Sequence, residues 1–179
     1  SNISAVVVGN ETLLREDMTE SALIDIIREV RTRVPVPVTT GETWDRWLKH
    51  RDLAEEVDFL AVHVLPYWEA IGAANAVGYT MERFRQIRET FPEKRAMIAE
   101  FGWPSRGYRN RDAGPDPMTQ ATIIREFIAE AARQGVSYNL MEAFDQPWKT
   151  MEGSVGPYWG VFDRDGTPKF SLAGAVGQP

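Results

Sequence analysis

Short runs of β-branched and apolar residues alternate along the chain with longer stretches whose apolar positions recur at helical spacing. Five short runs predict buried strands: Ile3–Val8, Val36–Thr39, Phe59–Val64, Ala96–Ala99 and Tyr138–Phe144. The stretches between them predict amphipathic helices. These cover about Thr19–Arg33, Thr43–Glu56, the positions Met81, Phe84, Ile87 and Phe91, and the positions Ile123, Ile124, Phe127, Ile128 and Ala131. Pro92 and Gly135 are expected to end the last two helices.

The alternation of strands and helices predicts an α/β fold. Parallel neighbours need a crossover connection, which a helix usually supplies, so the five strands are expected to pair in parallel. Two architectures satisfy this pattern: an open doubly wound sheet, or part of a (β/α)8 barrel. Both place functional residues at the carboxyl ends of the strands.

Composition narrows the function classes. The chain has 179 residues, 43% of them hydrophobic, and a formal net charge of −6, which is typical of one globular domain covering residues 1–179. An acidic balance argues against nucleic-acid binding, which normally requires a basic face. The absence of cysteine excludes thiolate catalysis, disulfides and cysteine-ligated zinc. The run Ala5–Val8 is far shorter than the roughly 20 residues of a spanning helix, so no membrane insertion is expected in this segment.

Carboxylates and tryptophans recur where the predicted strands end. Glu11 follows the first strand and Glu100 follows the fourth, each just before a turn. Cleavage of a glycosidic bond needs one protonated carboxyl group, which donates to the leaving oxygen, and one ionised carboxylate. Flat indole rings suit the apolar faces of sugars, so the pattern favours glycoside chemistry. A single glutamate after a strand can also be a surface charge, tryptophans can be plain core, and His63 is expected in the core or beside the site.

Three motifs carry a resemblance to a known family. They are Val8-Gly9-Asn10-Glu11, Glu100-Phe101-Gly102-Trp103-Pro104-Ser105 and the segment Glu142–Lys149. Their order and spacing resemble glycoside hydrolase family 17, which contains β-1,3-glucanases and β-1,3-glucan transglycosylases. Phe101 stands where the family's nucleophile motif has threonine.

The resemblance implies a retaining enzyme that acts on β-1,3-glucan oligo- or polysaccharides through a covalent glycosyl-enzyme. Glu11 would be the acid/base and Glu100 the nucleophile, and retention implies carboxyl groups about 5–5.5 Å apart. Asn10 would hydrogen-bond the sugar 2-hydroxyl, and Tyr67 would support the nucleophile. The expected substrate-binding residues are Asn10, Tyr67, Trp103, Glu142, Trp148 and Lys149. No metal or organic cofactor is required.

The family's barrel also implies which part of it is present. Its acid/base follows strand four and its nucleophile follows strand seven, which agrees with the three strands counted from Glu11 to Glu100. Residues 1–179 would then form one partial (β/α)8-barrel domain with strands four to eight. A full barrel takes about 200–250 residues, so the amino-terminal strands or a complementing chain are expected to be needed. The resemblance implies an extracellular or periplasmic location.

Other functions stay open at this point. Hydrolysis and transglycosylation use the same catalytic pair, so the motifs do not separate a glucanase from a glucanosyltransferase. The chain could instead be a non-catalytic glucan-binding module or an inactive barrel fragment. An open-sheet enzyme of another kind is disfavoured, because no nucleotide-binding fingerprint is present.

Overall fold

The computed structural model describes residues 2–172, so Ser1 and residues 173–179 of the predicted domain lie outside the described residues. Strands and helices alternate, as the hydrophobic pattern predicts. In chain order the elements are β1 (Val6–Asn10), α1 (Glu20–Arg31), β2 (Val38–Thr43), α2 (Trp44–Lys49), α3 (Arg51–Glu56), β3 (Leu60–His63), α4 (Ala73–Thr90), β4 (Ala96–Phe101), α5 (Pro117–Gln134), β5 (Tyr138–Leu140) and the 3-10 turns η1 (Thr150–Glu152) and η2 (Gly156–Tyr158).

The strands follow one another in the sheet in chain order, β1-β2-β3-β4-β5. β1 pairs in parallel with β2, and β2 with β3, which confirms the predicted pairing for these strands. The register of the first pair shifts between Val7 and Asn10, where β1 ends. β2 and β3 are almost wholly buried, as expected for parallel strands covered on both faces.

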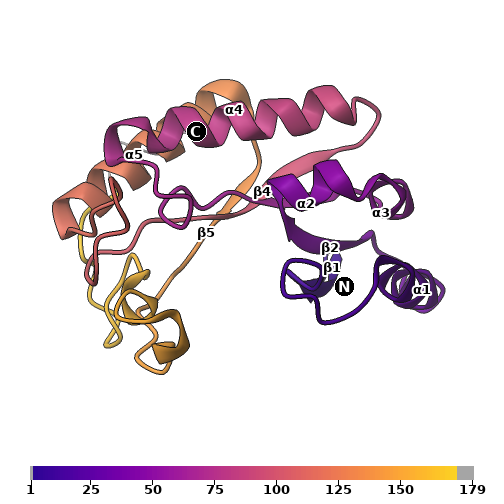
Figure 1. Cartoon of the computed structure of the whole chain (residues 1–179), viewed down its shortest axis with the longest axis horizontal. Coiled ribbons are helices and arrows are strands. Elements are labelled where there is room, and N and C mark those ends of the chain that lie inside the picture. Colours follow the sequence, from indigo (N-terminus) through magenta and orange to yellow (C-terminus); the bar gives the residue numbers. More distant parts are fainter. Residues whose placement is uncertain (1, 173–179) are drawn as a thin grey trace. The chain divides into compact units, whose positions relative to one another are not determined.

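The chain divides into two compact units, and β4 runs from the first into the second. The first unit comprises the residues up to Val64 together with Glu82–Ala99. In this unit α1 packs against β1, β2 and α3, while α2 packs against β2, β3 and α3 (Figure 1). The buried side chains of α1 are Leu23, Ile24 and Ile27, one face of an amphipathic helix.

The second unit comprises Leu65–Met81 and the residues from Glu100 onward. The strongest apolar stripe of the sequence forms the buried face of α5, and the helix ends before Gly135, as the sequence predicts. Asp116 accepts hydrogen bonds from the first turn, and Gly135 ends the helix at φ 64°, in the left-handed region. Phe127 on this face stacks on Phe101 of β4, with ring centroids 3.7 Å apart.

Two long side chains tie the loops of the second unit together. The Gln120 amide, completely buried on α5, donates to the carbonyl oxygens of Trp103, Trp159 and Gly160. The Lys169 ammonium donates to Asp145 at 2.6 Å and to the Ser105 hydroxyl at 2.8 Å. Burial is the largest influence on the pKa of Lys169 and lowers it from the ordinary value. The loops after β4 and β5 are therefore fixed to each other.

Several elements differ from the sequence prediction. β2 runs to Thr43 and β4 to Phe101, so Glu42 and Glu100 lie on their strands and not after them. The helix predicted over Thr43–Glu56 is two helices, because His50 leaves the helical region at φ −105° and ψ 70°. The strand predicted to reach Phe144 ends at Leu140, because the backbone beyond it bonds to Val161 and Phe162. α4 begins eight residues before Met81, at Ala73, in a stretch of small and polar residues with no apolar stripe.

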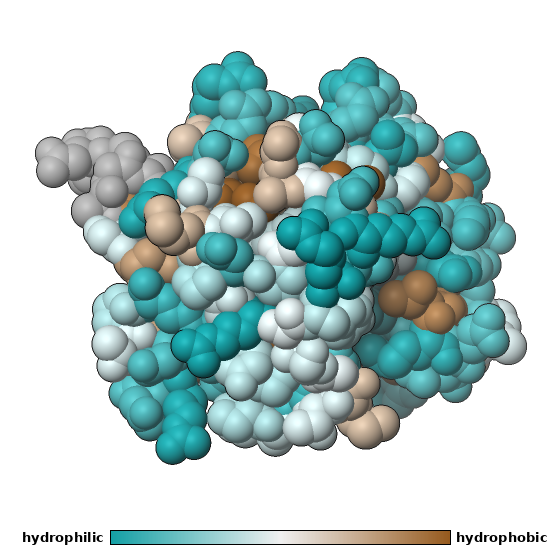
Figure 2. All heavy atoms as spheres, turned by 60° about the vertical axis from the view of Figure 1, so that its left-hand side comes forward, coloured by the Kyte–Doolittle hydropathy of each residue, from teal (hydrophilic) through white to brown (hydrophobic). Residues whose placement is uncertain are grey.

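Hydrophilic side chains dominate the face shown in Figure 2, where hydrophobic atoms reach the surface in small groups. No helix among residues 2–172 is both long enough and apolar enough to cross a membrane.

Candidate active site

The turn after β1 holds Glu11 in an unusual backbone conformation. Glu11 has φ 52°, in the left-handed region that residues with a side chain seldom adopt, and Gly9 before it has φ 80°. The Glu11 amide donates to the carbonyl of Gly41 on β2 at 2.7 Å. The exposed Asn10 pairs with Gly41 in the sheet register. The sequence motif thus forms a sharp turn that β2 supports.

Glu42 on β2 is a completely buried carboxylate beside this turn. Its oxygens accept hydrogen bonds from the backbone N–H groups of Leu13 at 2.8 Å and Leu14 at 3.4 Å. Burial raises the pKa of Glu42 above its ordinary value, and the nearby Glu11 charge raises it further, whereas the two backbone hydrogen bonds and His63 lower it. The turn after β1 is therefore clamped by a side chain from the neighbouring strand.

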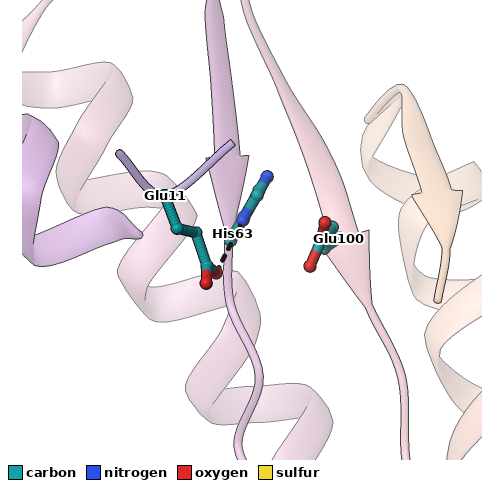
Figure 3. A group of neighbouring side chains, drawn as sticks. All are labelled: Glu11, His63 and Glu100. Carbon is teal, nitrogen blue, oxygen red and sulfur yellow. Dashed lines mark hydrogen bonds and ion pairs between the residues drawn. The ribbon is translucent and has the colours of Figure 1, made fainter. Parts of the chain in front are cut away.

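His63 at the end of β3 orients the side chain of Glu11. Its Nδ1 lies 2.9 Å from Oε1 of Glu11, and the imidazole is 2% exposed, whereas the Glu11 side chain is 19% exposed. Figure 3 shows this hydrogen bond. The expectation that His63 lies in the core or beside the site is confirmed, because it is buried and bonded to the candidate acid/base.

Glu100 lies on β4, one residue before the strand ends (Figure 3). It is partly buried, whereas the next residue, Phe101, is completely buried against α5. Successive side chains of a strand point to opposite faces, so the phenyl ring faces α5 and the Glu100 carboxylate leaves the strand on the other side. The departure from the family's threonine therefore serves the core of the second unit.

The segment after β5 brings Glu142 and Lys149 together. Oε2 of Glu142 accepts from Nζ of Lys149 at 2.9 Å and from the Gln146 amide at 2.5 Å. The Glu142 side chain is only 12% exposed, and its Oε1 is buried and has no hydrogen-bond partner among residues 2–172. Trp148, on the same segment, is 73% exposed and leaves a ring free to contact a ligand.

Two of the expected substrate-binding residues are buried instead. Trp103 is completely buried, and its indole N–H donates to the carbonyl of Gly114. Tyr67 is also completely buried, packs edge-on against Trp103, and donates from its hydroxyl to the carbonyl of Tyr108. Burial raises the pKa of the Tyr67 phenol, which therefore stays protonated. Of these three aromatic side chains, Trp148 alone is exposed, whereas the rings of Trp103 and Tyr67 are buried.

The sequence did not single out Gln146. It places Glu42 at the end of the second predicted strand, where a site residue and a surface charge are equally compatible with the pattern. Gln146 stands four residues after Glu142, a spacing that permits contact but does not by itself indicate it. Glu42 follows the glycine of the second strand, and its partners Leu13 and Leu14 lie 29 and 28 positions earlier. Its position at a strand end was the only sequence signal that could have found it.

Comparisons with known proteins agree with the motifs. The family model described as the BtgE/BtgC glycoside hydrolase domain matches residues 1–160. Over 96% of its length the chain is 28% identical to a glucan 1,3-beta-glucosidase of Schizosaccharomyces pombe and 27% identical to one of Candida albicans. It spans 58% and 63% of the length of these two relatives.

Solved structures share the fold. An active-site mutant of Rhizomucor miehei beta-1,3-glucanosyltransferase in complex with laminaritriose matches 98% of this chain and 66% of its own, with a TM-score of 0.89 at 23% identity. A plant beta-glucan endohydrolase matches 94% of this chain with a TM-score of 0.70 at 15% identity. The family match and these relatives confirm the resemblance to the β-1,3-glucanases of glycoside hydrolase family 17. The chain belongs to the BtgE/BtgC glycoside hydrolase domain family.

Proposed function

We propose that this chain carries the catalytic pair of a retaining glycosidase that acts on β-1,3-glucan. The observation that carries the proposal is Glu11, held in its family motif by β2 and hydrogen-bonded to the buried His63. The names of the relatives, glucan 1,3-beta-glucosidases, supply the substrate class.

In the proposed reaction Glu100 attacks the anomeric carbon while the bond to the leaving oxygen breaks and Glu11 donates a proton to that oxygen. Glu11 then removes a proton from the incoming hydroxyl as it displaces Glu100, which restores both carboxyl groups. This assigns Glu11 as the acid/base and Glu100 as the nucleophile. A carboxyl separation of about 5–5.5 Å belongs to this mechanism and stays a prediction.

The remaining site residues take supporting roles in the proposal. Asn10, exposed at the end of β1, would bind the sugar 2-hydroxyl. Lys149 and Gln146 fix the Glu142 carboxylate, which leaves its buried Oε1 to accept a hydrogen bond from substrate or water. Trp148 would provide a flat surface for a sugar ring.

Transfer to a second glucan is the other outcome of the same chemistry. Trp68 is 37% exposed and stacks on the buried Trp159, with ring centroids 5.7 Å apart and an interplanar angle of 29°. A fixed and partly exposed indole can hold an acceptor sugar where water would otherwise enter. A glucanosyltransferase is among the structural neighbours. Both observations favour transfer as the second candidate function.

We further propose that the five strands are strands four to eight of one (β/α)8 catalytic domain. The support is the order of the five strands and the share of the relatives' length that the chain spans. The remaining strands would come from elsewhere in a longer protein or from a complementing chain. Because polymeric glucans lie outside the cytoplasm, we place the activity in an extracellular or periplasmic setting.

The test is incubation with a laminari-oligosaccharide followed by mass spectrometry of the products. Glu100→Gln should abolish turnover, because an amide does not form the covalent intermediate, whereas the exposed Glu93→Gln is the matched control and should stay active. Products longer than the substrate indicate transfer, and only shorter products indicate hydrolysis.

Two outcomes would contradict the enzyme proposal. Turnover that survives Glu100→Gln would remove the assigned nucleophile. Binding of laminarin without turnover, unchanged in Glu100→Gln, would make the chain a glucan-binding module. The same measurement with a longer chain, extended to the length of its relatives, tests the partial-barrel proposal. Turnover that appears only in the longer chain would support it.

A further inference from the structure

Glu42 is a buried carboxylate that the proposed chemistry does not use. It lies on β2, opposite Val62 of β3, and none of its surface is exposed. A buried carboxylate is costly unless its oxygens are hydrogen-bonded. The Glu42 oxygens accept hydrogen bonds from the backbone N–H groups of Leu13 and Leu14. The structural contribution of the Glu42 carboxylate therefore lies in these two hydrogen bonds.

Those two hydrogen bonds fix the turn that carries Glu11. The turn begins with Glu11 itself in the left-handed region, a conformation that persists only where the surroundings hold it. Gly41 accepts from the Glu11 amide at 2.7 Å, and the next residue, Glu42, accepts from the amides two and three positions beyond Glu11. Two adjacent residues of β2 therefore hold the turn on both sides of its strained position.

The side chain of Glu11 is held from a third strand. His63 of β3 bonds to its carboxylate, and the ring of His63 lies against Gly41, where a Cβ atom would stand only 2.7 Å from Nε2. The imidazole can fix the carboxylate only if the backbone of Glu11 is already in place. Glu42 supplies that condition, because its hydrogen bonds go to the backbone and not to the reacting group.

We propose that Glu42 is a positioning residue for Glu11, acting through the Leu13 and Leu14 amides to place the acid carboxyl group for proton donation. This rests on the proposed function, in which Glu11 protonates the leaving oxygen. Glu42 contacts no sugar in this role. Its loss should therefore affect the step that needs a placed proton much more than it affects substrate binding.

The test compares two substrates in the wild-type protein, Glu42→Gln and Glu42→Asp. One is a laminari-oligosaccharide, whose leaving group needs a proton. The other is a dinitrophenyl β-laminaribioside, whose leaving group departs without one. Misplacement by about 1 Å can cost about 100-fold in rate, so kcat/KM of Glu42→Gln on the oligosaccharide should fall about 10–100-fold with KM nearly unchanged. On the dinitrophenyl substrate kcat/KM, which reports the first step, should fall less than about 3-fold.

Glu16→Gln is the matched control, because it makes the same chemical change at an exposed position of the same turn. Its kcat/KM should equal that of the wild-type protein on both substrates. If Glu42→Gln does not fold, Glu42→Asp keeps the charge and shortens the reach, and the same split between the substrates is expected.

Equal losses on both substrates, or no loss on either, would overturn the positioning role while leaving the proposed function intact. A wild-type protein that turns over neither substrate, even as the longer chain that includes the part its relatives have in addition, would overturn the proposed function and the positioning role with it. The wild-type and Glu100→Gln measurements therefore distinguish the two failures.

Discussion

Replacing Gly41 by alanine tests how tightly β1, β2 and β3 meet at the candidate acid/base. The added Cβ would lie 2.7 Å from Nε2 of His63 and 3.2 Å from Oδ1 of Asn10. The first approach is about 0.7 Å shorter than an ordinary contact of 3.4 Å. The histidine ring does not swing away at low cost, because it is buried and its other nitrogen bonds to Glu11.

The size of the effect follows from these contacts. Inserting an atom into a packed site costs about 1–3 kcal/mol. The lower entropy of the unfolded alanine chain offsets about 0.4–1 kcal/mol of this. A net loss of about 0–2.6 kcal/mol, centred on about 1.3 kcal/mol, is therefore expected in Gly41→Ala, and in a chain of this length the central value lowers Tm by about 3–5 °C. Activity on laminari-oligosaccharides should also fall, because the strain acts on the residues that hold Glu11.

Thermal unfolding followed by circular dichroism measures the first effect, and kcat/KM measures the second. Gly78→Ala is the control, because Gly78 is exposed in α4 and a Cβ there would meet nothing within 4 Å. Alanine favours a helix interior by about 0.5–1 kcal/mol, so this variant should raise Tm. If Gly41→Ala unfolds at or above the wild-type Tm, the close packing of His63 on Gly41 is refuted. The inference that this packing helps to place the Glu11 carboxyl group is then refuted as well.

Three further predictions concern other parts of the molecule. Phe101→Ala removes a completely buried ring stacked on Phe127 and should lower the free energy of unfolding in urea by about 3–5 kcal/mol; a loss below about 1 kcal/mol would show that the stack contributes little. Because the pKa of Glu42 is raised above 4.5, its ionisation is less favourable in the folded than in the unfolded chain. The stability that Glu42 contributes is therefore complete below pH 4.5 and is lost as the pH rises through the raised pKa. The Tm of Glu42→Gln relative to that of the wild-type protein should thus increase between pH 4 and 7. A Tm difference that stays constant over this range would contradict the raised pKa. Trp148→Ala removes a 73% exposed ring, so the Tm of this variant should stay unchanged. Loss of a ring contact worth about 0.5–1.5 kcal/mol should raise KM for laminari-oligosaccharides about 2–12-fold. An unchanged KM would argue against a sugar contact at Trp148.

The sequence predicts elements best where local chemistry decides them. α5 was predictable in position and ending, because its apolar stripe and Gly135 act within one segment. The first half of α4 was not, because Ala73, Ala74 and Gly78 show no periodic apolar face. The early end of β5 depends on backbone bonds to Val161 and Phe162, some twenty residues later. Local pattern therefore fails where distant backbone groups take the hydrogen bonds.

In the candidate site, too, the residues in contiguous motifs were predictable and the contacts between distant residues were not. Glu11 and Glu100 were predictable from their motifs, because the motifs are contiguous in sequence. The bond between Glu11 and His63 joins residues 52 positions apart, and that between Leu13 and Glu42 joins residues 29 apart, so neither leaves a local signature. The burial of Trp103 was equally invisible, because a tryptophan after a strand can either face a ligand or fill the core.

The Gln120 amide has a consequence for how this fold can vary. Its three acceptors, on Trp103, Trp159 and Gly160, are all backbone carbonyls, and every residue type has one. The hydrogen bonds themselves do not depend on the side chains of the three acceptors, but Trp103 and Trp159 are buried, and a Cβ atom at Gly160 would lie 2.2 Å from the Asp145 nitrogen. Exposed positions of these loops can thus change by substitution, whereas an insertion in one loop would move its acceptor carbonyl and disturb the other loop. The loops of the second unit are therefore constrained in length more than in the identity of their exposed side chains.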